Sequence, residues 1–269
     1  MGGCCEKFRA EFRKQRLDYD DFNQGEWISV FGESSVSCLT PVVYQFLQLS
    51  EALAIMGILL WSAYVENKEY NCGLKWFIFL THWSLTLQVV YLWLSVFTTW
   101  RANAMKKDQA QKQAKMPWYA QLTWVLQDIL LPLTFFVFIL YFGLVLPAKG
   151  GKPQALSFFT HGVNFVIMLL DMYLSRQPYY LLHGFYVAFL LATYTTFTYV
   201  YHKLEGTSCT GNPYIYKAVD WTNAKSTSVA AFIGITVSVA VVNIIFWLVI
   251  TFLFPSRKVS ETREIELTE

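Results

Sequence analysis

Residues 229–254 read VAAFIGITVSVAVVNIIFWLVITFLF, a predominantly apolar stretch without a charged side chain. About 20 such residues are enough for an α-helix to cross the hydrocarbon core of a bilayer. Similar stretches precede it at residues 43–64, 76–99, 118–146, 157–175 and 179–202. The sequence therefore predicts an all-α protein, a polytopic membrane bundle of about six transmembrane helices.

These spans divide the chain into three parts. We expect a basic arm at residues 1–42, a six-span membrane domain at 43–254 and a short tail at 255–269. Charged residues make up 15% of the chain, well below the roughly 25% of soluble domains. The segments between the spans are too short for a large soluble domain, so the partner that the composition implies first is the lipid bilayer.

The basic residues indicate an orientation. Fourteen of the 21 Lys and Arg lie in the arm, the tail and the second and fourth loops, and seven lie in the other loops. Because cytoplasmic segments carry the excess of positive charge, both termini are predicted to be cytoplasmic. We expect the plasma membrane rather than the endoplasmic reticulum as the location. The basic segments contain no recognised nucleic-acid-binding motif, so no nucleic acid partner is expected.

The predicted topology places the cysteines on two different sides of the membrane. Cys4, Cys5 and Cys38 fall on the cytoplasmic side, whereas Cys72 and Cys209 fall in the first and fifth loops, on the other side. Two cysteines in an oxidising compartment predict a disulfide bond between those loops. The alternative is a pair of unbridged loop cysteines.

The N-terminus suggests lipid attachment. Gly2 is followed by Cys4 and Cys5, but Glu6 stands where the myristoylation pattern has Ser or Thr. Palmitoylation of Cys4 and Cys5 is therefore the modification expected. The basic residues that follow would suit either an arm lying on an anionic membrane surface or a solvated arm.

Two of the spans carry polar residues at helical spacing. The stripes consist of Thr81, Ser84, Gln88, Tyr91 and Ser95 in one span, and of His161, Asn164, Asp171 and Ser175 in the other. Lipid cannot satisfy these groups by hydrogen bonding. We therefore expect the two helices to face each other inside the bundle.

Thr81 and His161 are the candidate catalytic residues. Both lie one to two turns below the predicted outer surface, and this similar depth on facing helices would make them neighbours. A hydroxyl beside an imidazole is the minimal equipment for nucleophilic acyl transfer. In that case Asn164 and Gln88 would orient the substrate, and a long apolar cavity would open between the two spans. The alternative is that Thr81 and His161 only pack the helices together.

Four further ionisable residues lie within or beside the spans, in the cytoplasmic half: Glu51, Asp128, Asp171 and His183. One interpretation is a buried polar network that fixes how the fourth and fifth spans turn. The other is a proton or ion path, which would make the protein a small transporter or channel. The chain shows neither an internal repeat nor a pair of broken helices, which favours the network. No metal-binding or cofactor-binding motif is present, so neither a metal nor a cofactor is predicted.

The fourth span also carries a family resemblance. Thr160-His161-Gly162-Val163-Asn164 through Asp171, Pro178 and His183 resembles the rolling stone family, as does Tyr214-Ile215-Tyr216-Lys217-Ala218-Val219-Asp220-Trp221. The resemblance covers most of the six-span region. It implies a multi-pass membrane protein with a role in cell fusion, in myogenesis or in development, acting through membrane protein partners.

A more distant resemblance is to the androgen-induced and androgen-dependent TFPI-regulating membrane hydrolases. It implies a threonine hydrolase of fatty acid esters, with Thr81 as nucleophile and Gln88 matching a family glutamine. Where that family has its catalytic histidine, this chain has Asn164, whose amide cannot act as a general base. His161 would have to substitute, because His82 points about 100° away from Thr81 on a helix. Asn164 thus favours the fusion role over the hydrolase.

Overall fold

The computed structural model describes residues 25–106, 115–148, 150–152, 154–223 and 225–253. Throughout these residues the secondary structure is helical and contains no strand, which confirms the all-α prediction. Six helical segments are long and apolar enough to cross a membrane, which confirms a six-span bundle. These segments are Pro41–Tyr70, Leu80–Lys106, Trp118–Gly143, Ala155–Leu174, Leu181–Lys203 and Ser228–Phe252.

The principal helices are α3 (Pro41–Tyr70), α4 (Leu80–Lys106), α5 (Trp118–Leu140), α8 (Asn164–Leu174), α9 (Gly184–Lys203) and α10 (Lys225–Leu253). The shorter helices are α2 (Glu26–Gly32), α6 (Leu146–Ala148) and α7 (Ala155–Phe158). Two π-helical turns extend the third and fourth spans: η4 (Tyr141–Val145) follows α5, and η5 (Phe159–Val163) precedes α8. The 3₁₀ turns are η2 (Gly73–Ile78), η6 (Leu181–His183) and η7 (Lys217–Val219).

Local signals explain where α3 begins and ends. Thr40 caps its N-terminus, because the threonine hydroxyl accepts a hydrogen bond from the Val43 N–H at 3.4 Å. Pro41 follows at the first helical position, where its missing N–H costs nothing. The helix stops at Asn71, which adopts the left-handed conformation with φ of 49°, one that asparagine tolerates better than most residues.

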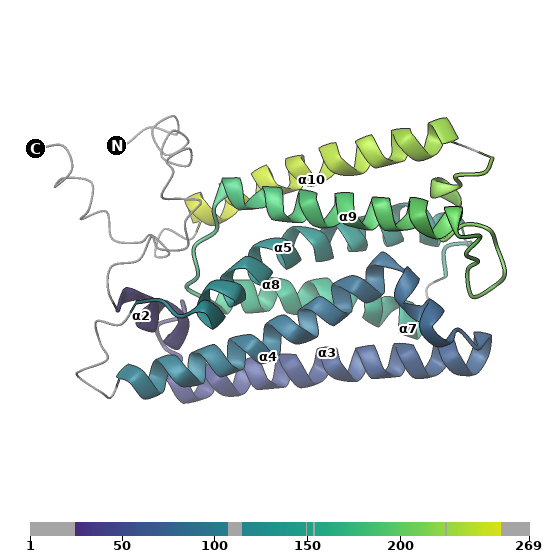
Figure 1. Cartoon of the computed structure of the whole chain (residues 1–269). Coiled ribbons are helices and arrows are strands. Elements are labelled where there is room, and N and C mark those ends of the chain that lie inside the picture. The colour runs from purple at the N-terminus through teal and green to yellow at the C-terminus, as the bar shows by residue number, and fades with distance from the viewer. Residues whose placement is uncertain (1–24, 107–114, 149, 153, 224, 254–269) are drawn as a thin grey trace, which may run out of the picture.

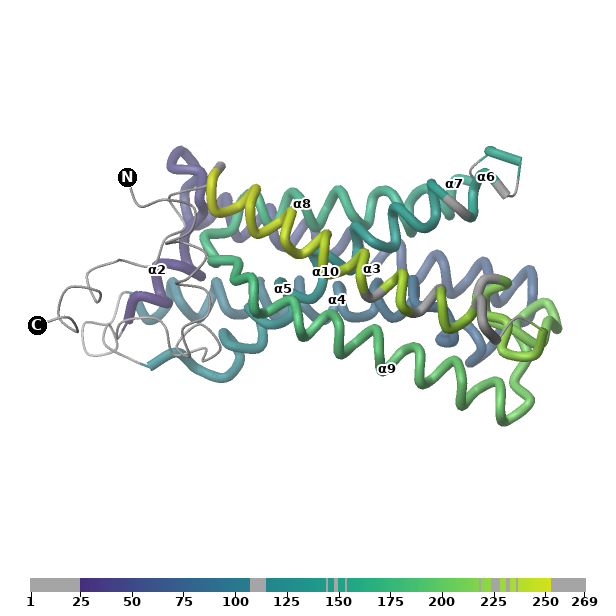
Figure 2. The backbone as a smooth tube through the Cα atoms, turned by 90° about the horizontal axis from the view of Figure 1, so that it is seen from above, coloured from purple at the N-terminus to yellow at the C-terminus, as the bar shows by residue number. Residues whose placement is uncertain are grey.

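Spans that follow each other in the sequence run antiparallel, and α5 lies at the centre. It packs against α4, α8, α9 and α10, while α3 packs against α4 and α8. Seen from above, α10 lies over α5 and beside α9 (Figure 2). We call the end of the bundle at α2 the α2 end, and the opposite end, with the loops after α3 and α9, the disulfide end (Figure 1).

The outward faces of the spans are apolar, as lipid requires. Large hydrophobic side chains remain exposed along helix after helix, including Phe46, Leu53, Leu60, Trp93, Phe189, Val237, Val241 and Ile245. On a soluble protein such a surface would be an interaction site or a liability. Here it forms the face that contacts hydrocarbon.

The second span and the arm before the first span differ in structure from what the sequence led us to expect. The second span begins at Leu80 rather than at residue 76, because the preceding residues form η2. Gly73, with φ of 52°, starts that turn, and its N–H donates to the Asn67 side chain at 3.2 Å. The arm before the first span also contains structure that hydropathy did not reveal. Trp27 and Phe31 of α2 are buried against the end of α4.

A glycine at the start of α9 gives a stability prediction. A methyl group added to Gly184 would lie 2.2 Å from the Asn243 side-chain nitrogen, which donates to the Leu181 carbonyl at 2.8 Å. We expect Gly184→Ala to destabilise the fold by about 1–3 kcal/mol through overpacking. At Gly234 a methyl group would meet nothing within 4 Å, so Gly234→Ala should be neutral or stabilising by up to about 1 kcal/mol. Thermal unfolding in detergent would measure both, and equal melting temperatures would contradict the prediction.

Candidate functional site

The two polar stripes face each other, as the sequence predicts. The Gln88 amide of α4 donates to the Asn164 carbonyl of α8 at 3.2 Å, and the Tyr91 hydroxyl donates to Asp171 at 2.5 Å. Helix α3 joins the seam, where the Gln48 amide donates to the Ser95 hydroxyl of α4 at 2.9 Å. The side chains of this seam are buried. The resulting polar seam ties α3, α4 and α8 together inside the bundle.

Thr81 is the second residue of α4 and is partly buried. Its neighbour is Tyr216, from the loop after α9, whose hydroxyl accepts from the Leu80 N–H at 3.1 Å. Burial raises the pKa of Tyr216, and hydrogen bonds from Leu80, Tyr194 and Thr81 act in the opposite direction. Thr81 is therefore held against the loop at the disulfide end.

His161 lies in the π-helical turn η5. Its ring stacks on Tyr141, from the other π-helical turn, with centroids 3.9 Å apart and planes 7° from parallel. Beside it, Phe159 contacts Trp61 of α3 edge to face at 5.6 Å. Such π turns occur often at functional sites, but an aromatic ring covers one face of this imidazole.

The axial positions of Thr81 and His161 differ. The Gln88–Asn164 hydrogen bond sets a common level for the parallel helices α4 and α8. Thr81 lies seven residues before Gln88, about 10 Å along the axis, whereas His161 lies three residues before Asn164, about 4 Å. Thr81 is thus roughly one turn nearer the disulfide end. Neither residue lines the pocket beside Trp221 or the pocket beside Arg176.

Three unsatisfied oxygens lie at or near the level of the Gln88–Asn164 hydrogen bond. Ser84 Oγ, Gln88 Oε1 and Asn164 Oδ1 are buried, and the described part of the structure gives these three atoms no hydrogen-bond partner. The Asn164 amide nitrogen is engaged, because it donates to the Thr160 carbonyl at 3.2 Å. The two amide oxygens accept hydrogen bonds and cannot donate, so they suit a hydroxyl or a water better than an ester carbonyl.

The four buried ionisable residues fall into two groups. Asp128 of α5 and His183 of η6 form a pair with 2.5 Å between Oδ2 and Nδ1, and both side chains are 1% exposed. Trp124 packs on the His183 ring edge to face. Glu51 of α3 instead interacts electrostatically with Asp171 of α8. One group thus fixes the turn between α8 and α9, and the other belongs to the polar seam.

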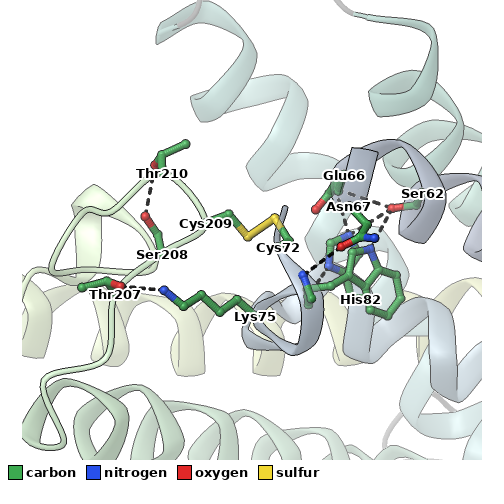
Figure 3. The surroundings of a disulfide bond; sticks show 12 residues. Ser62, Glu66, Asn67, Cys72, Lys75, His82, Thr207, Ser208, Cys209 and Thr210 are labelled. Carbon is green, nitrogen blue, oxygen red and sulfur yellow. Dashed lines mark hydrogen bonds and ion pairs between the residues drawn. A yellow bond between two sulfur atoms is a disulfide. The ribbon is translucent and has the colours of Figure 1, made fainter. Parts of the chain in front are cut away.

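A third polar cluster, at the disulfide end, was not anticipated (Figure 3). The ring of His82 stacks on Trp76 at 3.9 Å, and its Nδ1 lies 2.5 Å from the Trp76 carbonyl oxygen. Its Nε2 lies 3.2 Å from Ser62 Oγ and 3.3 Å from Glu66 Oε1. Through His82, these contacts hold Trp76 of η2 close to Ser62 and Glu66 of α3. The sequence signal available was His82 itself, an ionisable residue near the end of a span.

The disulfide end is also held covalently. Cys72 and Cys209 form a disulfide bond, with Cα atoms 5.0 Å apart, and Lys75 donates to the Thr207 hydroxyl at 2.7 Å (Figure 3). Among the described residues there is no group of three or more His, Cys, Asp or Glu able to hold a metal ion. Cys4 and Cys5, the expected lipidation sites, lie outside the described residues.

Six apolar helices with apolar outer faces and a polar seam buried among them define a multi-pass membrane protein. The family model described as "Protein rolling stone" matches residues 5–263, and the chain belongs to that family. It is 30% identical over 193 residues to the protein rolling stone of Drosophila melanogaster, covering 68% of each chain. No solved structure matches it.

Proposed function

We propose that this protein acts in cell–cell fusion during muscle development, at the plasma membrane, through contacts with other membrane proteins. The observation that carries the proposal is the family match, which extends over the whole bundle. The interior supports a scaffold rather than a channel, because its buried polar side chains pair across helices. Asp128 pairs with His183, and Tyr91 donates a hydrogen bond to Asp171.

The disulfide end offers a surface for partners. Its two loops are joined by the Cys72–Cys209 bond, so they keep a defined shape. Leu74 and Leu204, which lie in these loops, are 87% and 75% exposed. Apolar side chains on an ordered surface are what protein contacts bury.

A content-mixing assay between two cell populations tests this role. Expression of the chain should raise mixing above that of a control membrane protein at equal surface level. Leu74→Ser and Leu204→Ser should reduce mixing, whereas Lys68→Ser, at the exposed end of α3, should not. Mixing that is unchanged by expression would overturn the proposed role.

The fusion role requires the disulfide end to face outward, with both termini in the cytoplasm. The distribution of basic residues supports this orientation, as does the disulfide bond, because such bonds persist in oxidising compartments. Epitope tags at either terminus should be stained only after permeabilisation. Staining of a tag on intact cells would contradict this topology. In this orientation Cys4 and Cys5 face the cytoplasm, where palmitoylation would occur.

A second candidate function is hydrolysis of fatty acid esters by Thr81 and His161. It is favoured by the unsatisfied oxygens of Ser84, Gln88 and Asn164 near the level of His161, because these oxygens can accept a hydrogen bond from the water that hydrolysis consumes. We expect turnover to be weak or absent, because Tyr141 covers the His161 ring. Labelling by a serine- and threonine-directed probe, lost in Thr81→Ala and His161→Ala but kept in Thr86→Ala, would establish the hydrolase. Equal labelling of all variants would exclude these residues.

A further inference from the structure

A pocket of about 270 Å³ lies at the α2 end of the bundle. It forms where the connector from α2 to α3 meets the end of α4 and the loop after α8. Two basic residues, Lys106 and Arg176, line it together with the carboxylate of Glu33. This pocket is separate from the polar seam and from the Thr81 and His161 region.

The three charged residues form one array. Glu33 accepts from Lys106 through one oxygen and from the Arg176 Nη1 through the other, the latter at 2.5 Å. The hydrogen bond from Lys106 is the main cause that lowers the pKa of Glu33, with the charges of Lys106 and Arg176 adding to it. Glu33 is thus held ionised. Two cations against one carboxylate leave one positive charge in excess in the pocket.

The basic residues keep donors to spare. Arg176 also donates from Nε to the Ser34 carbonyl at 2.8 Å, which fixes the plane of the guanidinium. Its Nη2 has no partner within the described ranges, and the Lys106 ammonium carries further N–H groups beside the one used. A planar, fixed guanidinium next to an ammonium suits the oxygens of a phosphate group.

The pocket's position favours a lipid over a soluble phosphate. It lies where α4 ends at Lys106 and α3 begins at Pro41, which is the level of the membrane surface. The rest of its lining combines the apolar residues Val36, Leu39 and Pro41 with the serines Ser34 and Ser37. A phosphate joined to acyl chains matches both parts of this lining.

We propose that this pocket binds the phosphate group of an anionic phospholipid. Lys106 and Arg176 contact the phosphate oxygens, and the apolar side takes the adjoining glycerol and acyl region. The binding does not depend on the orientation proposed above. The leaflet that supplies the lipid does depend on that orientation, because the anionic lipids are concentrated in the cytoplasmic leaflet.

Purified full-length chain in phosphatidylcholine nanodiscs provides the test, with phosphatidic acid as the added lipid and melting temperature as the readout. Phosphatidic acid should raise the melting temperature progressively as its fraction increases, along a curve from which an apparent affinity is obtained. Lys106→Gln should weaken the apparent affinity about fivefold, and Arg176→Gln about tenfold. Arg101→Gln removes a charge on the same helix from a residue that lies beside Trp100 and outside the pocket, so it should change nothing.

Glu33→Gln separates lipid binding from fold support. It removes the carboxylate that competes for both cations, so it should tighten binding about fivefold even if the lipid-free protein melts earlier. Weaker binding of phosphatidic acid by Glu33→Gln would overturn the site. The site would also be overturned if phosphatidic acid stabilised Lys106→Gln and Arg176→Gln as much as it stabilises the native chain. If inorganic phosphate at millimolar concentration gives the full stabilisation, the ligand is the free anion and the lipid proposal fails.

Discussion

Replacing Cys72 and Cys209 together by serine is expected to lower the free energy of unfolding by about 2–4 kcal/mol. The bond closes a loop with a sequence separation of 137 residues. For a soluble chain, a loop of that length would place the effect near the upper end of the range. Here the unfolded helices stay inserted in the membrane. The ends of these helices are already confined, so removing the bond should lower the free energy of unfolding by less than it would in a soluble chain.

The effect should be concentrated at the disulfide end. Without the bond, η2 is still held by the His82 cluster and by the Lys75–Thr207 and Gly73–Asn67 hydrogen bonds, and the Tyr194 hydroxyl donates to the Ile78 carbonyl at 2.8 Å. Thermal unfolding in detergent, with and without reductant, would measure the loss. Cys38→Ser is the control, because Cys38 is a free, exposed cysteine. Reductant should destabilise the native chain and leave the double serine variant unchanged. A reductant effect of equal size on the double variant would show that the bond is not its cause.

Hydropathy and side-chain spacing were sufficient to predict the bundle. The six spans follow from the length of the apolar stretches, and the facing of α4 and α8 follows from polar residues that lipid cannot satisfy. Gln88, Tyr91, Asn164 and Asp171 meet for that reason.

The local details of the ends escaped prediction because they depend on backbone conformation and tertiary contacts. The π turns that bring Tyr141 and His161 together have no hydropathy signal. Helix α2 is short, and its stability comes from packing of Trp27 against α4 rather than from propensity. The depth estimate that made Thr81 and His161 neighbours assumed an uninterrupted helix from residue 76. The chain forms η2 there instead, so Thr81 lies at the start of α4.

The Asp128–His183 pair is expected to give the largest effect of a single substitution. Asp128→Ala should destabilise the fold by about 3–5 kcal/mol, because it leaves the buried His183 ring without this carboxylate. The same turn between α8 and α9 is held by the Trp124 N–H, which donates to the Pro178 carbonyl at 2.8 Å. Loss of the pair should therefore loosen α9 and lower the yield of folded protein.

Three matched variants identify the cause of that loss. Asp128→Asn keeps an oxygen that can accept from Nδ1, so it should cost about 1–2 kcal/mol. Thr134→Ala, on the same helix, removes a buried hydroxyl that bonds only to backbone carbonyls, so it should cost about 1 kcal/mol. The double variant Asp128→Leu/His183→Leu should recover much of the stability lost in Asp128→Ala, because a buried polar pair can be replaced by apolar packing. A double variant less stable than Asp128→Ala would instead show that His183 stabilises the turn independently of Asp128.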